Sequence, residues 1–157
     1  MLKRQSVLRA AWTLLPAVAL LAACNEIPRT DREAQQAQLF QQYAGPPVES
    51  FTYLGRYDSW TSLGGNQLVV WTTPFEAYLI TVKPPCPDLP FAQRLGLTQT
   101  GARTVNQRFD FVLVGQNRCW IQSIQPVDYM QMRRDRRQQS ADAQAAPETA
   151  KQEAQRQ

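Results

Sequence analysis

Histidine is absent from this chain of 157 residues. Its absence excludes Ser-His-Asp and Cys-His catalysis and removes the commonest protein ligand for zinc and iron. A carboxylate pair or a Ser-Lys pair is the acid–base chemistry that remains, and no recognisable motif surrounds either. We therefore expect a protein that is not an enzyme and that holds neither a metal ion nor a cofactor.

The sequence also lacks a hydrophobic run long enough to span a membrane. Residues 10–21 carry no charge, but 12 residues form a helix of only about 18 Å, against a hydrocarbon core of roughly 30 Å. Basic residues precede this run and two alanines follow it, which favours a signal peptide over residues 1–23. An ordinary secretory signal and a short core helix are the alternatives. The basic residues are Lys3, Arg4 and Arg9.

The segment Leu21-Ala22-Ala23-Cys24 resembles the bacterial lipobox. The resemblance implies that Cys24 becomes the first mature residue and carries a diacylglyceryl group on sulfur and a further acyl chain, such as palmitate, on its amine. Several chains are needed for a durable anchor, because one alone binds a membrane only marginally. Asn25 stands where aspartate commonly marks retention in the inner membrane. We therefore expect an anchor on the periplasmic face of the outer membrane, with the inner membrane as the alternative.

The mature chain has little net charge once the signal is removed. Three of the 17 Lys and Arg residues lie in residues 1–23, which leaves 14 basic against 13 acidic residues in the mature chain. The basic isoelectric point of the precursor is thus mostly a property of the signal. Strong attraction to nucleic acid is not supported, and we expect no nucleic-acid partner.

Cysteine is limited to three residues, of which Cys24 is assigned to lipid. Cys86 and Cys119 remain as an even pair in an oxidising compartment, and we expect a structural disulfide between them. Such a bridge closes a loop of about 34 residues and stabilises the fold by roughly 3–4 kcal/mol in the chain-entropy model. A metal pair, which lacks two further ligands, and free thiols are the alternatives.

Two polar arms flank the centre of the mature chain. Residues 24–47 are predicted to be a lipidated tether with a helix over 31–43, started by Thr30 and Glu33 as a capping box. We favour a polar spacer, although Leu39, Phe40 and Tyr43 could dock the last turn on the domain. Residues 130–157 contain no Leu, Ile, Val or aromatic residue, so disorder, or a frayed helix ending before Pro147, is expected. Their arginines, at 133–137, could touch anionic lipid or simply be solvated.

Residues 48–129 hold nearly all the aromatic and β-branched residues of the mature chain. Their period of two predicts a small antiparallel β-barrel or curled sheet with one short helix. Prolines at 84, 85 and 87 end a strand, and Asp88 could cap the short helix. The predicted strands are 57–63, 68–73, 77–82, a weak hairpin of 97–100 with 102–105, and a hairpin of 109–114 with 119–124.

Short matches across this domain suggest a family. The chain resembles a family of small proteobacterial lipoproteins classed only as a domain of unknown function, over roughly residues 57–128. The resemblance implies a lipid-anchored envelope location and the two-cysteine bridge, and it transfers no catalytic residue. The matching segments are Tyr57-Asp58-Ser59-Trp60, Leu68-Val69-Val70-Trp71, Ala77-Tyr78-Leu79, Cys86-Pro87-Asp88-Leu89, Leu97–Thr100 near Arg103, Arg108-Phe109-Asp110 and Cys119-Trp120-Ile121.

Aromatic residues supply the sharpest binding hypothesis. If they are exposed on one sheet face, they form a platform for a glycan or a protein partner. Filling a small core is the alternative, and the commoner role of such residues. The candidate platform consists of Trp60, Trp71, Tyr78 and Trp120.

Five carboxylates in the domain are the remaining candidates for chemistry. A pair of them could hydrolyse a glycan if two converge in a cleft about 5–10 Å apart. Turns, a helix cap and a solvated or arginine-paired Asp110 account for them more simply. They are Asp58, Glu76, Asp88, Asp110 and Asp128.

Together these features predict a lipid-anchored periplasmic envelope protein without enzymatic activity. Its expected role is to bind another envelope component, either a protein or a glycan. An inhibitor or small-ligand binder that uses a sheet face or a barrel mouth is the alternative.

Overall fold

The computed structural model describes residues 28–101 and 103–154, with side chains as far as residue 145. Strands dominate this part of the chain, which confirms the mainly β fold predicted from the sequence. In chain order the elements are α1 (Arg29–Gln42), β1 (Ser50–Thr52), β2 (Ser59–Ser62), β3 (Gln67–Thr73), β4 (Glu76–Val82), the 3₁₀ helix η1 (Leu89–Phe91), β5 (Leu95–Leu97), β6 (Thr104–Asn106), β7 (Phe111–Val114), β8 (Asn117–Val127) and α2 (Tyr129–Ala154).

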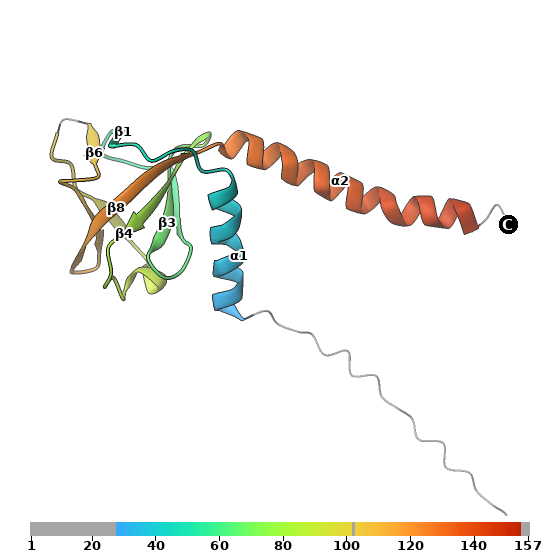
Figure 1. The fold of residues 1–157 in the computed structure, drawn as a ribbon, viewed down its shortest axis with the longest axis horizontal. Helices are drawn as coiled ribbons and strands as arrows, with labels where there is room; N and C mark the ends of the chain where they lie inside the picture. The colour runs from blue at the N-terminus through green and yellow to red at the C-terminus, as the bar shows by residue number, and fades with distance from the viewer. Residues whose placement is uncertain (1–27, 102, 155–157) are drawn as a thin grey trace, which may run out of the picture.

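Six antiparallel strands curl into a nearly closed barrel in the order β2-β3-β4-β8-β7-β5, with a small β1-β6 sheet beside them (Figure 1). The long strand β8 carries the curvature, because residues 117–120 pair with β7 and residues 121–127 pair with β4. Between the two edge strands, the Tyr57 hydroxyl donates to the Leu95 carbonyl oxygen at 2.7 Å. This side-chain bond joins the edges that the backbone ladder leaves open.

The central strands are buried on both faces. In β3, Leu68 and Val70 face the barrel interior, whereas Val69 faces the opposite side, as the pleat of a strand requires. This double burial explains why β3 is a continuous apolar run rather than an alternating one. The interior cluster includes Leu68, Val70, Ile80, Val82, Leu89, Val105, Val112, Ile121 and Ile124.

Helix α1 packs on the outer face of the sheet and does not stand off as the polar spacer that the sequence favoured. Phe40 is 7% exposed and joins an outer cluster with Val69, Leu79 and Met132, and Leu39 packs against it. Burying a phenylalanine stabilises a fold by about 1.5–3 kcal/mol, which is enough to fix a short helix with few apolar residues. The first residues of the predicted tether, 24–27, lie outside the described residues.

The predicted capping box at the start of α1 is wrong. The helix begins at Arg29 after Pro28, with no side-chain hydrogen bond at the cap. The Glu33 carboxylate instead accepts a hydrogen bond from the Arg29 side chain at 2.7 Å. Because Pro28 lacks an N–H and has a fixed φ, the helix starts there without the reciprocal bonds of a capping box.

The C-terminal arm forms the helix α2, which projects away from the barrel (Figure 1). Asp128 starts it, because its carboxylate accepts a hydrogen bond from the Gln131 N–H at 2.9 Å. Met132 is buried against the outer cluster, so the first turns are held by packing that the sequence did not reveal. The helix runs past Pro147, where we expected helical structure to end.

The first turns of α2 also bond to α1. The Tyr43 hydroxyl donates to the Asp135 carboxylate at 2.8 Å, and this bond is the main reason that the pKa of Tyr43 is raised. The bond links the two helices at the end of the sheet where both meet β8. Within the described residues, no helix combines the length and apolar character needed to cross a bilayer.

Two local predictions between β4 and β7 are wrong. Among the described residues, the predicted hairpin of 97–100 with 102–105 is not found, because β5 pairs with β7 and β6 pairs with β1; Gly101 and Thr104 form an isolated bridge. The expected helix from Asp88 is the short 3₁₀ turn η1. Asp88 does not cap it through its side chain, because its carboxylate accepts from the Asn117 amide instead.

Candidate functional site

The sheet does not gather the predicted aromatic platform on one exposed surface. Trp60, Val70 and Tyr78 are register partners across β2, β3 and β4, so Trp60 and Tyr78 share the face of Val70 and pack against the interior cluster. Trp71 follows Val70 in β3 and therefore points to the opposite face. All three platform residues on these strands are half-buried, whereas Trp120 lies elsewhere.

Tyr78 closes one part of the barrel. Its ring stacks on Phe51 with 4.4 Å between centroids, and its hydroxyl donates to Glu76 Oε1 at 2.6 Å. Burial, followed by this hydrogen bond, raises the pKa of Tyr78 well above its usual value. Glu76 also accepts from the Thr72 hydroxyl at 2.9 Å, so both groups are engaged within the domain.

Trp71 holds the helices on the sheet. Its ring meets Phe40 of α1 edge-on at 5.7 Å and Tyr129 of α2 edge-on at 5.5 Å. Such aromatic pairs contribute about 0.5–1.5 kcal/mol each beyond the area they bury. Trp71 is thus a packing residue, although its buried Nε1 has no hydrogen-bond partner among the described residues.

Trp120 is the platform residue that lies open to solvent, with 47% of its surface exposed. Its ring lies 4.0 Å from that of Phe111 between centroids, tilted by 46°. The Arg118 guanidinium lies 4.6 Å from the centroid of the Phe111 ring, within the range of a cation–π contact. Two aromatic rings and a cation therefore contact one another on the outside of the barrel.

The β7–β8 hairpin aligns these side chains. Phe111 and Trp120 are direct register partners, and Arg118 lies two residues before Trp120 on the same side of β8. Val112 and Cys119 point inward and are buried. We did not single out Phe111 and Arg118 from the sequence, although the alternation within the predicted hairpin 109–124 places them on the face of Trp120.

A shallow hollow of about 550 Å³ adjoins Trp120 and carries two more cations. Lys83 is held beside Trp120 because its backbone N–H donates a hydrogen bond to the Trp120 carbonyl oxygen at 2.8 Å. Arg108 contacts Glu49 at 3.4 Å in a fully exposed pair, which solvent screens strongly. We call the surface formed by Lys83, Arg108, Phe111, Arg118 and Trp120 the aromatic–cationic face.

Four of the five candidate carboxylates have structural hydrogen bonds. Glu76 bonds to Tyr78 and Thr72, Asp88 to Asn117, and Asp128 caps α2. Asp58 is exposed on the loop before β2, beside Arg56 in a second shallow hollow. Among the residues that the structure describes, no group of three metal-ligating side chains comes together.

Asp110 is buried and is not the solvated or arginine-paired residue that we expected. Its side chain is fully enclosed and accepts hydrogen bonds from the Thr98 hydroxyl at 3.0 Å, the Thr100 hydroxyl at 2.8 Å and the Asn106 N–H at 2.7 Å. Thr98 also accepts from the Phe111 N–H at 2.8 Å. Asp110 thus ties the segment after β5 and the end of β6 to the start of β7, which carries Phe111 of the aromatic–cationic face.

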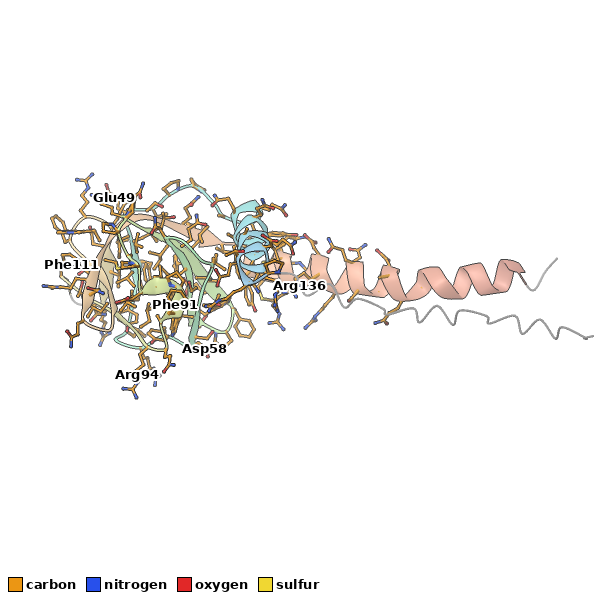
Figure 2. The ribbon with its side chains drawn as sticks, turned by 90° about the horizontal axis from the view of Figure 1, so that it is seen from below. Glu49, Asp58, Phe91, Arg94, Phe111 and Arg136 are labelled. Atoms are coloured by element: carbon orange, nitrogen blue, oxygen red, sulfur yellow. A yellow bond between two sulfur atoms is a disulfide. The ribbon has the colours of Figure 1, made fainter. Side chains whose placement is uncertain are left out.

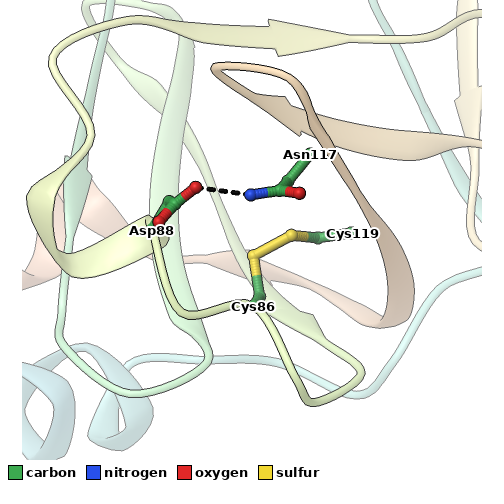
Figure 3. Close-up of a disulfide and its surroundings, with 4 residues drawn as sticks. All are labelled: Cys86, Asp88, Asn117 and Cys119. Atoms are coloured by element: carbon green, nitrogen blue, oxygen red, sulfur yellow. Dashed lines mark hydrogen bonds between the residues drawn. A yellow bond between two sulfur atoms is a disulfide. The ribbon is translucent and has the colours of Figure 1, made fainter.

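The predicted disulfide between Cys86 and Cys119 is present (Figure 3). Both cysteines are 3% exposed, and the bridge joins the segment after β4 to β8. Cys119 precedes Trp120, so the bridge fixes the strand that carries the exposed ring. The predicted lipidation site, Cys24, lies outside the described residues.

The comparisons with known proteins give a family and no activity. No curated protein and no solved structure matches the chain. Residues 7–143 match the model of a family of unknown function, DUF6491, which bears out the resemblance at that level. This match spans the sheet, both cysteines of the bridge, α1 and the first turns of α2. The chain therefore belongs to the DUF6491 family of unknown function.

Proposed function

We propose that this protein is a lipid-anchored binding module without enzymatic activity, held by acylated Cys24 at the periplasmic face of the outer membrane. Its aromatic–cationic face binds an acidic glycan of the cell envelope. The anchor is supported by the basic N-terminus, the 12-residue apolar run and the segment Leu21–Cys24. The mass of the N-terminal peptide of the protein isolated from cells tests the acylation.

The observation that carries the binding role is the exposed Trp120 ring in contact with Phe111, with cations beside both. The flat apolar faces of sugar rings pack on an exposed indole, and guanidinium groups bind carboxylates or phosphates with charge-assisted hydrogen bonds. Arg118 lies two residues before Trp120 on β8, and Lys83 lines the hollow beside Trp120. An acidic glycan presents both the sugar rings that pack on the indole and the acidic groups that bind the cations.

The shape of the site favours a polymer over an enclosed small ligand. The hollow beside Trp120 is open and shallow, whereas sites for small ligands bury most of the ligand surface. The alternative suggested by the sequence, an inhibitor or small-ligand binder, therefore receives less support. A non-enzymatic role is supported by the absence of histidine and by the structural hydrogen bonds of four of the five carboxylates.

Replacement of Trp120 by alanine is expected to weaken binding to purified peptidoglycan, an acidic envelope glycan, by at least about tenfold. The reason is that an exposed tryptophan at the centre of a binding surface typically contributes 2 kcal/mol or more. Co-sedimentation with peptidoglycan measures the affinity. Binding is also expected to fall as the salt concentration rises, because the cations are exposed.

Phe75→Ala is the matched control, because Phe75 is also an exposed aromatic residue, 62% open to solvent, on the distant β3–β4 turn. Its removal should leave binding unchanged. Equal binding by the native protein, Trp120→Ala and Phe75→Ala would show that the aromatic–cationic face is not the binding surface.

A further inference from the structure

Helix α1 sets which end of the barrel lies next to the N-terminus. Its first residue, Arg29, donates a hydrogen bond to the Pro90 carbonyl oxygen, and its guanidinium lies 5.4 Å from the centroid of the Phe91 ring. Pro90 and Phe91 belong to η1, which closes one end of the barrel (Figure 1). The start of α1 is therefore attached to this end, which we call the η1 end.

The other end of α1 is attached at the opposite end of the barrel. Ala44, just after the helix, forms a bridge with Val127 at the end of β8. Between the two attachments, Phe40 is buried and Glu33 packs against Gly64, where its carboxylate would have to move for a β-carbon to fit. With both ends and the middle in contact, α1 has one orientation on the barrel.

Little chain separates α1 from the proposed lipid. Only four residue steps lie between Cys24 and Pro28, which precedes the helix. Fully extended, four steps span at most about 14 Å. An acyl anchor at Cys24 therefore holds Pro28, at the start of α1, within about 14 Å of the lipidated residue and so keeps the η1 end close to the membrane, whatever the path of the intervening residues.

The η1 end carries side chains suited to a lipid surface. Phe91 is 73% exposed, the largest exposed fraction among the large hydrophobic residues described, and Arg94 is exposed close by (Figure 2). Both line a shallow hollow of about 490 Å³ at this end. Aromatic rings settle at the membrane interface, and arginine binds lipid phosphates.

We propose that the η1 end rests on the phospholipid surface, with Phe91 inserted among the headgroups and Arg94 on their phosphates. This proposal rests on the acylation of Cys24 in the proposed function. Of the acidic groups at this end, Glu33 pairs with Arg29 and Asp88 bonds to Asn117, whereas Asp31, in the first turn of α1, is exposed. Arg94 has no ion-pair partner among the described residues.

The same geometry places the arginine cluster of α2 away from the membrane. Helix α1 has 14 residues, so its two ends are about 21 Å apart. The arginines at 133–137 follow the end of β8 and lie beside the far end of α1, where Tyr43 bonds to Asp135. This separation exceeds the Debye length of about 8 Å at physiological salt, so their attraction to lipid is screened.

Quenching by brominated phospholipids tests the orientation. The chain from Cys24 onward, with its disulfide intact, is coupled through the Cys24 thiol to maleimide lipid in vesicles of phosphatidylethanolamine and phosphatidylglycerol. Phe91→Trp places a fluorophore at the η1 end, and Phe75→Trp places a matched one at the opposite end. We expect the fluorescence added by Phe91→Trp to be quenched at least twofold more than that added by Phe75→Trp.

A charge reversal at Arg94 supplies a second test of the orientation. Arg94→Glu added to Phe91→Trp should reduce the quenching at least twofold, whereas Arg56→Glu, at an exposed arginine near the opposite end, should not change it. Equal quenching of the two tryptophans, or no effect of Arg94→Glu, would overturn the proposed orientation. Because the lipid is attached chemically, this result does not depend on acylation in cells, which the mass of the N-terminal peptide reports separately.

Discussion

Replacement of Asp110 by alanine is expected to lower the free energy of unfolding by about 3–4 kcal/mol. The carboxylate is fully buried and accepts three hydrogen bonds, each shorter than or equal to 3.0 Å. Hydrogen bonds to a charged group contribute about 1.5–3 kcal/mol each, and a buried donor left without a partner costs about 1–3 kcal/mol. The hydroxyls of Thr98 and Thr100 can rotate toward other acceptors, so the three losses do not add in full.

The Asn106 N–H is the donor that cannot rotate away. Asp110→Asn keeps one acceptor oxygen but sets an amide N–H₂ near the other donors, so we expect a loss of about 1–2 kcal/mol. Urea unfolding with the disulfide intact measures both changes. Asp58→Ala is the matched control, because Asp58 is exposed, and it should alter the unfolding free energy by less than about 0.5 kcal/mol. If Asp110→Ala were as mild as Asp58→Ala, the buried network would not stabilise the fold.

Replacement of both Cys86 and Cys119 by alanine should lower the free energy of unfolding by about 3–4 kcal/mol. The two cysteines are 33 positions apart, and closing a loop of that length restricts the unfolded chain by this amount in the chain-entropy model. The double replacement removes both cysteines of the bridge together, so neither partner remains as an unpaired thiol within the sheet domain. A small β-domain with a limited core has little stability to spare, so the loss should be plain in urea unfolding.

Reduction of the native protein provides the control for the disulfide. If the bridge acts by restricting the unfolded chain, the reduced native protein and the double alanine variant should unfold at similar urea concentrations. Trp120 should also become more mobile without the bridge, because Cys119 fixes β8 directly before it. A double variant within about 1 kcal/mol of the oxidised native protein would contradict this account.

Local sequence patterns predicted the parts of the fold in which strands adjacent in sequence pair with each other. Strand β3 follows from its run rich in Val, Trp and Thr, and β4 and the β7–β8 hairpin follow from alternating apolar residues and from turn residues such as Gly115. The pairings of β1 with β6 and of β5 with β7 join segments far apart in sequence. Strands of three residues carry too little pattern to specify a distant partner, so these pairings could not be predicted.

Packing of the helices on the sheet determines which of the predicted platform residues are exposed. Trp120 was named from the sequence and is exposed, but Trp71 is covered because α1 and α2 lie over its face of the sheet. A polar helix with one buried residue, Phe40, gives no clear signal that it docks. The burial of Asp110 was similarly missed, because its donors lie after β5 and at the end of β6, and no local pattern specifies that these positions meet.

Photo-crosslinking in living cells tests the central claim most directly, namely that the aromatic–cationic face binds an envelope component. A benzophenone amino acid replaces Gln122, which is exposed and lines the hollow beside Trp120, so the proposed binding residues stay intact. The same group at Phe75 is the control on a distant exposed turn. We predict adducts with a glycan-containing envelope component from position 122 and none above background from position 75. Equal adducts from the two positions, or none from position 122, would contradict the account.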